Sequence, residues 1–228
     1  MKVYRTSRED SEELAAKEIG NVLHDLAESQ ETVVVGVVGG TSVAGIYEHL
    51  KTLPIRVWSK VHIFLADDRQ VPITDERSNG KLVYDTFVKD LVDRGDMPKE
   101  NFHPYIHDNN VTEYCKAFKQ QGGRFDLLIL SAGEDGHIAG LFPDHTIDYD
   151  NECFITFSDS PKPPAERMSA TKETLLDAQY AVLVAFGETK RAALEKFLNP
   201  ETEMSACPAK IVEHIPNASV FTDLHDKE

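Results

Sequence analysis

The chain has 228 residues, enough to bury one sizeable hydrophobic core, and its 41% hydrophobic and 28% charged residues are typical of a folded globular protein. Its 39 acidic and 24 basic side chains give a formal net charge of −15 at pH 7, which argues against nucleic acid as a partner. A small phosphorylated ligand is compatible with this charge only if cationic side chains and backbone N–H groups gather locally.

The cysteines and the length of the apolar runs indicate in which cellular compartment the protein is expected. Cys115, Cys153 and Cys207 are widely spaced and form no C-x-x-C pair, which predicts reduced, mostly buried thiols and no metal site. The first ten residues lack the apolar core of a signal peptide, and no apolar run approaches the ~20 residues of a membrane span. We therefore expect a cytoplasmic protein without membrane association, folded as a single domain over residues 1–228.

The first predicted element is a helix over residues 8–28. Its apolar side chains recur at spacings of three and four, and Ser7 with Asp10 forms an S-x-x-D capping signal. This pattern indicates a helix that packs one face on the core.

A β-branched apolar strand follows at residues 32–38 and ends in four small residues before a second helix. Such a junction lets backbone N–H groups and hydroxyls approach an anion at the helix N-terminus. It lacks the glycine patterns of nucleotide-binding loops. We interpret it as an anion-binding loop, the alternative being a tight turn with Ser42 as the N-cap. The four residues are Gly39, Gly40, Thr41 and Ser42.

A second buried strand over residues 61–66 runs into Asp67, Asp68 and Arg69. An arginine at a strand end is suited to forked recognition of a phosphate or of a sugar carboxyl equivalent, although a solvated ion-pair loop is the alternative. Helices are predicted next at residues 79–92 and 111–121, with a short extended piece near 102–105. His103 and His107 belong to no cluster in the sequence and are interpreted as structural.

Residues 125–143 begin as an apolar run too short for a normal helix and break into a glycine-rich polar loop with Glu134, Asp135 and His137. Ligands of open α/β sheets lie beyond the carboxyl ends of the strands. A histidine two residues after an aspartate in such a loop is a candidate base with a candidate orienting carboxylate. The alternative is a turn in which Asp135 satisfies backbone donors and the histidine is incidental.

The last third of the chain carries two more candidate cations. Three prolines between a strand at 153–157 and residue 171 predict a stiff loop that presents Arg167, which would otherwise be an ordinary surface arginine. Lys190 follows the strand 181–186 and falls in a first helical turn, where the helix dipole disfavours a cation unless an anion is bound nearby. A helix near 208–214 and a strand at 218–222 complete the pattern.

Strands alternate with helices along the whole chain. This order predicts a three-layer α/β/α sandwich around a mainly parallel, Rossmann-like sheet.

Residues 133–143, GEDGHIAGLFP, resemble the 6-phosphogluconolactonase loop G-x-D-G-H-x-A-S-L-F-P, with Gly140 in place of the usual serine. Residues 67–72 resemble the family's D-E-R-x-V-P and are followed by its S-N pair at residues 78–79. Further resemblances are to S-G-G-S-T-P at residues 38–43, to K-P-P-x-x-R-I-T-x-T at 162–171 and to G-x-x-K at 187–190.

The resemblance implies the sheet shared by these lactonases, the sugar-phosphate deaminases and the pentose-phosphate isomerases. It also implies hydrolysis of 6-phospho-D-glucono-1,5-lactone to 6-phosphogluconate in the oxidative branch of the pentose phosphate pathway, by a monomer or homodimer. No metal or other cofactor is expected, because a δ-lactone is already an activated ester.

The same resemblance suggests roles for the candidate residues. His137 would remove a proton from water, and Asp135 would orient it. Arg69 or Arg167 would stabilise the oxyanion or hold the substrate, and Asp67 would also bind the substrate. Lys190 and the small-residue loop at 39–42 would bind the phosphate.

Two rival functions remain open at the level of the sequence. One is a glucosamine-6-phosphate deaminase, in which Asp67 or Asp68 would abstract a carbon-bound proton. The deaminases carry a Glu five residues after the loop histidine, where this chain has Phe142, so the ring-opening partner is missing. The other is a non-catalytic sugar-phosphate sensor, since binding needs only the basic cluster.

Overall fold

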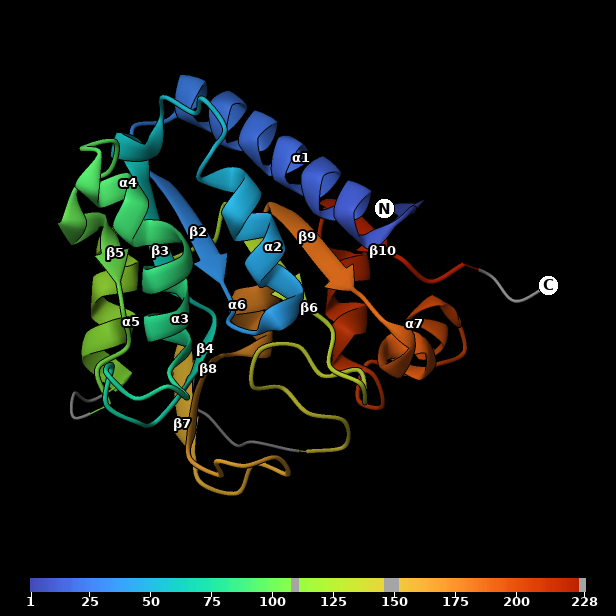
Figure 1. Cartoon of the computed structure of the whole chain (residues 1–228). Helices are drawn as coiled ribbons and strands as arrows, with labels where there is room; N and C mark the ends of the chain where they lie inside the picture. Colours follow the sequence, from blue (N-terminus) through green and yellow to red (C-terminus); the bar gives the residue numbers. More distant parts are fainter. Residues whose placement is uncertain (108–110, 146–151, 226–228) are drawn as a thin grey trace.

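The computed structural model describes residues 1–107, 111–145 and 152–225. Within these ranges the main sheet has seven strands, and every neighbouring pair is parallel. The predicted α/β fold with a mainly parallel sheet is therefore confirmed (Figure 1). The spatial order is β1 (Lys2–Arg5), β10 (Asn217–Thr222), β9 (Tyr180–Ala185), β6 (Leu127–Ser131), β2 (Val33–Val37), β3 (Val61–Leu65) and β5 (Phe102–His103).

Helix α1 (Arg8–Ser29) forms where the capping signal places it. The Ser7 hydroxyl accepts a hydrogen bond from the backbone N–H of Asp10, which satisfies one of the free donors of the first turn. A buried stripe follows the helical period and packs on α2 (Thr41–Leu50) and on the sheet. Its apolar members are Ala15, Ala16, Ile19, Leu23, Leu26 and Ala27.

Helices lie on both faces of the main sheet. The predicted helix over 79–92 is present as α3 (Asn79–Val83), a π-helical turn (Tyr84–Val88) and α4 (Lys89–Asp93), and Phe87 of the turn stacks on Tyr47 of α2. On the opposite face, Phe118 of α5 (Val111–Gln120) packs edge-on against Phe64 of β3. Later helices are α6 (Lys172–Leu176), α7 (Arg191–Leu198) and a 3-10 helix (Pro208–His214).

A second, antiparallel sheet of three strands lies beside the main one and has the order β4 (Asp67–Arg69), β8 (Arg167–Ala170), β7 (Phe154–Phe157). In Figure 1 it lies below the arrowhead of β2. Phe154 of β7 is fully buried and packs against Tyr114, Phe118 and Phe125, so the small sheet shares the main core. Burial of one such ring contributes roughly 1.5–3 kcal/mol.

The expectation that a stiff loop presents Arg167 is wrong, because Arg167 is the first residue of β8 and pairs with both Arg69 and Phe157. Pro161, Pro163 and Pro164 all precede the ladder. Their missing N–H groups therefore remove no hydrogen bond from the sheet.

Cys115, Cys153 and Cys207 are buried free thiols, as predicted. His103 is also buried in part: its ring stacks on Phe64 at 4.0 Å, and its Nε2 lies 3.0 Å from Nδ1 of His62. Burial, with a smaller contribution from His62, lowers the pKa of His103 to about 4. No helix among the described residues is both long and apolar enough to cross a membrane.

Candidate active site

A cavity of about 330 Å³ lies at the carboxyl ends of the central strands. Parallel strands deliver their following loops to one edge of a sheet, which is why residues far apart in the sequence meet there. Asp135 does not line the cavity itself but bonds to a residue that does. The predicted site residues that line it are Gly39, Gly40, Thr41, Ser42, Asp67, Arg69, His137, Arg167 and Lys190.

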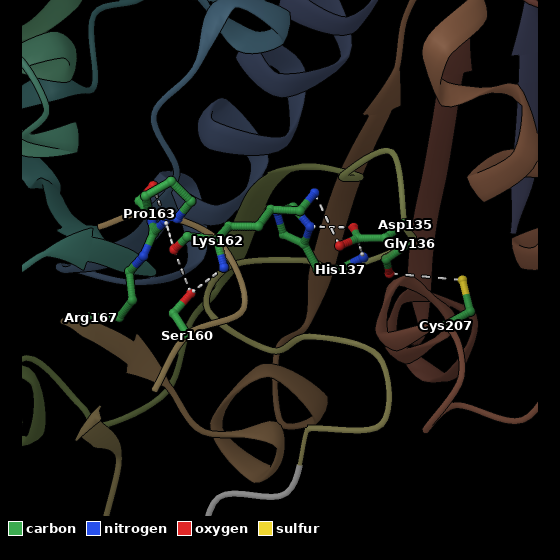
Figure 2. Close-up of polar contacts among 8 residues, drawn as sticks. All are labelled: Asp135, Gly136, His137, Ser160, Lys162, Pro163, Arg167 and Cys207. Carbon is green, nitrogen blue, oxygen red and sulfur yellow. Dashed lines mark hydrogen bonds and ion pairs between the residues drawn. The ribbon is translucent and has the colours of Figure 1, made fainter. Parts of the chain in front are cut away.

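His137 and Asp135 form a directly bonded pair in the loop after β6 (Figure 2). Nδ1 of the imidazole lies 2.5 Å from Oδ1 of the carboxylate, which also accepts the backbone N–H of His137 at 3.2 Å. An ionised carboxylate can only accept, so Nδ1 carries the proton and the neutral ring has its lone pair on Nε2. That tautomer can take a proton from water.

Two glycines allow this loop to close around the imidazole. The backbone N–H of Gly133 donates to the carbonyl of His137 at 2.8 Å, and a Cβ at Gly133 would lie only 1.9 Å from Nδ1. Gly136 has φ +96°, a conformation that other residues rarely adopt. The glycines therefore set the position of the histidine, rather than forming a turn in which the histidine is incidental.

The second oxygen of Asp135 faces a lysine that the sequence did not single out. Nζ of Lys162 lies 3.0 Å from Oδ2. Burial raises the pKa of Asp135, but the hydrogen bond and charge of His137 and the hydrogen bond of Lys162 outweigh it and hold the pKa well below its usual range. The carboxylate is therefore ionised at neutral pH. The only sequence signal for Lys162 was its place in the K-P-P resemblance.

Phe142 covers the other side of the pair. Its ring lies 4.7 Å from the His137 ring and packs with Ile155 and Phe157 of β7 in a small apolar cluster. This ring contributes neither charge nor a proton to the cavity. The Phe142 ring packs the loop against the antiparallel sheet.

Arg69 is held by Asn79, a buried residue whose only mark in the sequence was the S-N pair. Nη1 of Arg69 donates to Oδ1 of Asn79 at 2.6 Å and to the carbonyl of Arg77 at 2.7 Å. Nδ2 of Asn79 in turn donates to Asp67, to its carbonyl at 2.9 Å and to Oδ1 at 3.1 Å. Burial raises the pKa of Asp67, and the charges of Arg69, Arg167 and His137 act against this rise.

Arg167 lines the cavity but turns most of its guanidinium inward. Nε donates to the carbonyl of Pro164 at 3.0 Å, and Nη2 donates to the carbonyls of Pro163 and Lys162 at 3.2 and 3.3 Å. The residue is only 5% exposed. Arg167 is therefore mainly the internal brace of the proline-rich loop.

The small-residue loop supplies open backbone donors. Gly40, with φ +110°, is the N-cap of α2, and no side chain caps that helix, so the alternative reading with Ser42 as N-cap is wrong. Gly39 permits close approach, because a Cβ there would lie 2.2 Å from Oδ1 of Asn79. The first N–H groups of α2 thus border the cavity, a favourable position for an anion.

Lys190 lies in a 3-10 turn (Glu188–Lys190) between β9 and α7 and borders the same cavity. Burial lowers its pKa, and the charge of Lys162 adds to this effect, whereas Glu134 and Asp135 oppose it. Two lysines and two arginines therefore surround the cavity of a chain whose net charge is −15. This is the local cationic cluster that a phosphorylated ligand requires.

The fold and the cavity define an α/β protein with a histidine–aspartate pair beside an anion-binding pocket at the strand ends. The model of the glucosamine-6-phosphate isomerase/6-phosphogluconolactonase family matches residues 6–221. The chain belongs to this family.

The chain is similar to curated relatives that bear one name. It is 32% identical over 200 residues to the 6-phosphogluconolactonase of Borreliella burgdorferi, covering 85% of each chain. It is 30% identical over 212 residues to the 6-phosphogluconolactonase of Caulobacter vibrioides, covering 88% of each.

Solved structures show the same fold at lower identity. The crystal structure of the 6-phosphogluconolactonase from Thermotoga maritima superposes with a TM-score of 0.79 at 23% identity, over 97% of this chain and 98% of that one. A monomeric glucosamine-6-phosphate deaminase superposes with a TM-score of 0.80 at 18% identity, over 97% of each chain. The fold is thus common to lactonases and deaminases, and only the site residues can separate the two activities.

Proposed function

We propose that the chain hydrolyses 6-phospho-D-glucono-1,5-lactone to 6-phosphogluconate. The observation that supports this most directly is the 2.5 Å contact between His137 and Asp135 at the edge of a cation-lined cavity. The names of the relatives support the same reaction. The proposal extends to a single domain over residues 1–228 that acts in the cytoplasm as a monomer or homodimer, without a nucleic acid partner.

In this proposal His137 is the general base. Nε2 takes a proton from water while the water oxygen bonds to the lactone carbonyl carbon, which gives a tetrahedral oxyanion. Collapse of this intermediate breaks the bond to the ring oxygen, and the proton on Nε2 passes to that oxygen. Asp135 stabilises the imidazolium between the two steps. The imidazole is neutral again at the end of the cycle.

Arg69 is the better candidate of the two arginines for the oxyanion. Arg167 uses Nε and Nη2 to hold loop carbonyls, whereas Arg69 is fixed through Nη1 by Asn79 and Arg77. Among the described residues none accepts a hydrogen bond from Nη2 of Arg69. A donor held in place before the reaction stabilises charge that develops in the transition state.

Lys190 and the N-terminus of α2 would bind the phosphate. Lys190 is partly desolvated, which strengthens its attraction to an anion, and the first turn of α2 has no side-chain cap. Asp67, which is buried and interacts electrostatically with both arginines, would keep them oriented and accept hydrogen bonds from sugar hydroxyls.

The test compares the wild-type protein with His137→Gln in a continuous lactonase assay, after subtraction of spontaneous ring opening. We expect kcat to fall by about 10²–10⁴-fold, the usual contribution of a positioned base. The affinity for 6-phosphogluconate, measured by calorimetry, should stay within a few-fold. His24→Gln, on the exposed face of α1, is the matched control and should be fully active.

Three outcomes would count against the proposal. Full activity of His137→Gln would remove this residue from the chemistry. Binding of the phosphosugar without turnover by the wild-type protein would make it a sensor. Activity that vanishes with a chelator and returns with a divalent ion would refute the metal-free route.

A further inference from the structure

The loop over residues 160–166 is built as a rigid support. The Arg167 guanidinium donates hydrogen bonds to three carbonyls of this loop. Gln70, which follows β4, donates its backbone N–H to the Glu166 carbonyl at 3.1 Å and its Nε2 amide to the Arg167 carbonyl at 3.2 Å. Ser160 Oγ donates to the Lys162 carbonyl at 3.0 Å and accepts the Lys162 N–H at 3.2 Å. The backbone of Lys162 is therefore fixed on both sides (Figure 2).

From this fixed backbone the Lys162 side chain extends to the catalytic pair (Figure 2). Its Nζ lies 3.0 Å from Oδ2 of Asp135, while Oδ1 of the same carboxylate bonds to His137. Both oxygens of Asp135 thus have a cationic or N–H partner. Without Lys162, only Oδ1 would keep its hydrogen bonds, both from His137, and Oδ2 of this one-third exposed carboxylate would lose its charged partner.

The two lysines at the cavity have different surroundings. Lys162 already has a counter-ion inside the protein, namely Asp135. Lys190 has no ion pair with a described residue, although Glu134 and Asp135 are near enough to act on it. The remaining charged groups around the pair are Asp67 and Arg69 on β4 and Arg167 on β8. Lys162 is therefore suited to hold the catalytic pair through Asp135, whereas Lys190 is suited to bind the anion of a ligand.

We propose that Lys162 is a positioning residue of the lactonase reaction: its ammonium fixes the Asp135 carboxylate so that Oδ1 faces Nδ1 of His137. This inference rests on the proposed role of His137. It assigns no contact between Lys162 and the substrate. Arg167 acts one step further away, because it holds the loop from which Lys162 extends.

The variants Lys162→Met and Lys162→Arg test this proposal. Methionine keeps an unbranched apolar side chain without the charge, and arginine restores a cation that can reach a carboxylate. We expect Lys162→Met to lower kcat by roughly 10-fold through misorientation, with KM for the lactone changed less than about twofold. Lys162→Arg should recover most of the loss. Lys17→Met, which removes an ion pair with Glu13 on the exposed face of α1, is the matched control, and its kcat and KM should equal those of the wild-type protein.

A double-mutant comparison distinguishes positioning from a structural defect. In a His137→Gln background, Lys162→Met should add no further loss, since Lys162 acts through the histidine.

A raised KM with unchanged kcat would make Lys162 a substrate-binding residue and overturn the inference. An additive loss in the His137→Gln background would overturn it as well. Failure of the proposed function is recognised separately, because the wild-type protein would then show no lactonase activity or His137→Gln would be fully active.

Discussion

Gly133→Ala should inactivate the enzyme because the added methyl group displaces the His137 imidazole. The added Cβ would lie 1.9 Å from Nδ1 of His137, whereas Cβ atoms essentially never approach closer than 3.0 Å. The imidazole must therefore move by at least the difference, 1.1 Å. Gly133 does not have a positive φ, so alanine fits the backbone and the perturbation falls on the ring. A misplacement of about 1 Å can cost 10²-fold in rate, which corresponds to ~2.7 kcal/mol.

The assay is kcat/KM for the lactone, with the melting temperature measured in parallel. We expect a loss of about 10²-fold or more, because the 2.5 Å contact between His137 and Asp135 is broken. Gly20→Ala on α1 is the control: it makes the same chemical change, and its Cβ meets the ends of the flexible Ile55 and Leu53 side chains, at 3.2 and 3.5 Å. It should keep full activity and gain slightly in stability. Activity of Gly133→Ala within twofold of wild type would refute the reasoning.

Three further predictions concern other parts of the molecule. Lys190→Ala should weaken binding of 6-phosphogluconate more than binding of gluconate, measured by calorimetry, and equal losses would mean that Lys190 does not contact the phosphate. The protein should release no ammonia from glucosamine 6-phosphate, because Phe142 occupies the position of the deaminase Glu; release at a rate near that of lactone hydrolysis would overturn the assignment. His103→Gln should lose less stability than wild type when urea unfolding is compared at pH 7 and pH 5. The pKa of His103 is about 4 in the folded protein against an ordinary 6.5, so the unfolded chain takes up the proton first as the pH is lowered. The free energy of unfolding therefore decreases from pH 7 to pH 5, and equal losses in both proteins would exclude His103 as the cause.

The sequence allowed the main sheet and the base loop to be predicted because their signals are local. The run before Ser131 is apolar and β-branched in part, and the glycines that follow it stop any helix. The positions of Asp135 and His137 are two residues apart, so their contact depends on a single turn. Local chemistry of this kind can be read without knowing the rest of the fold.

The features that could not be predicted depend on distant partners. Arg167 pairs with Arg69, which lies almost a hundred positions earlier in the chain, and nothing near Arg167 signals a strand. The Lys162 contact with Asp135 likewise joins two loops that meet only after the sheets have formed. The inward turn of the Arg167 guanidinium depends on the carbonyls of a folded loop. Such contacts follow from topology rather than from local pattern.

The pairing of Arg69 with Arg167 has a consequence for the stability of the whole protein. Directly opposed residues of an antiparallel pair project to one side, and like charges there are unfavourable. Buried Asp67, which interacts electrostatically with both arginines, offsets this repulsion. An anion bound in the cavity that both arginines line would add further negative charge, and its binding would strengthen the fold by mass action, by about 2.7 kcal/mol when the ligand is at 100 times its Kd. Under the proposed function, the lifetime of this protein against heat and proteolysis is therefore tied to the supply of its phosphorylated ligand.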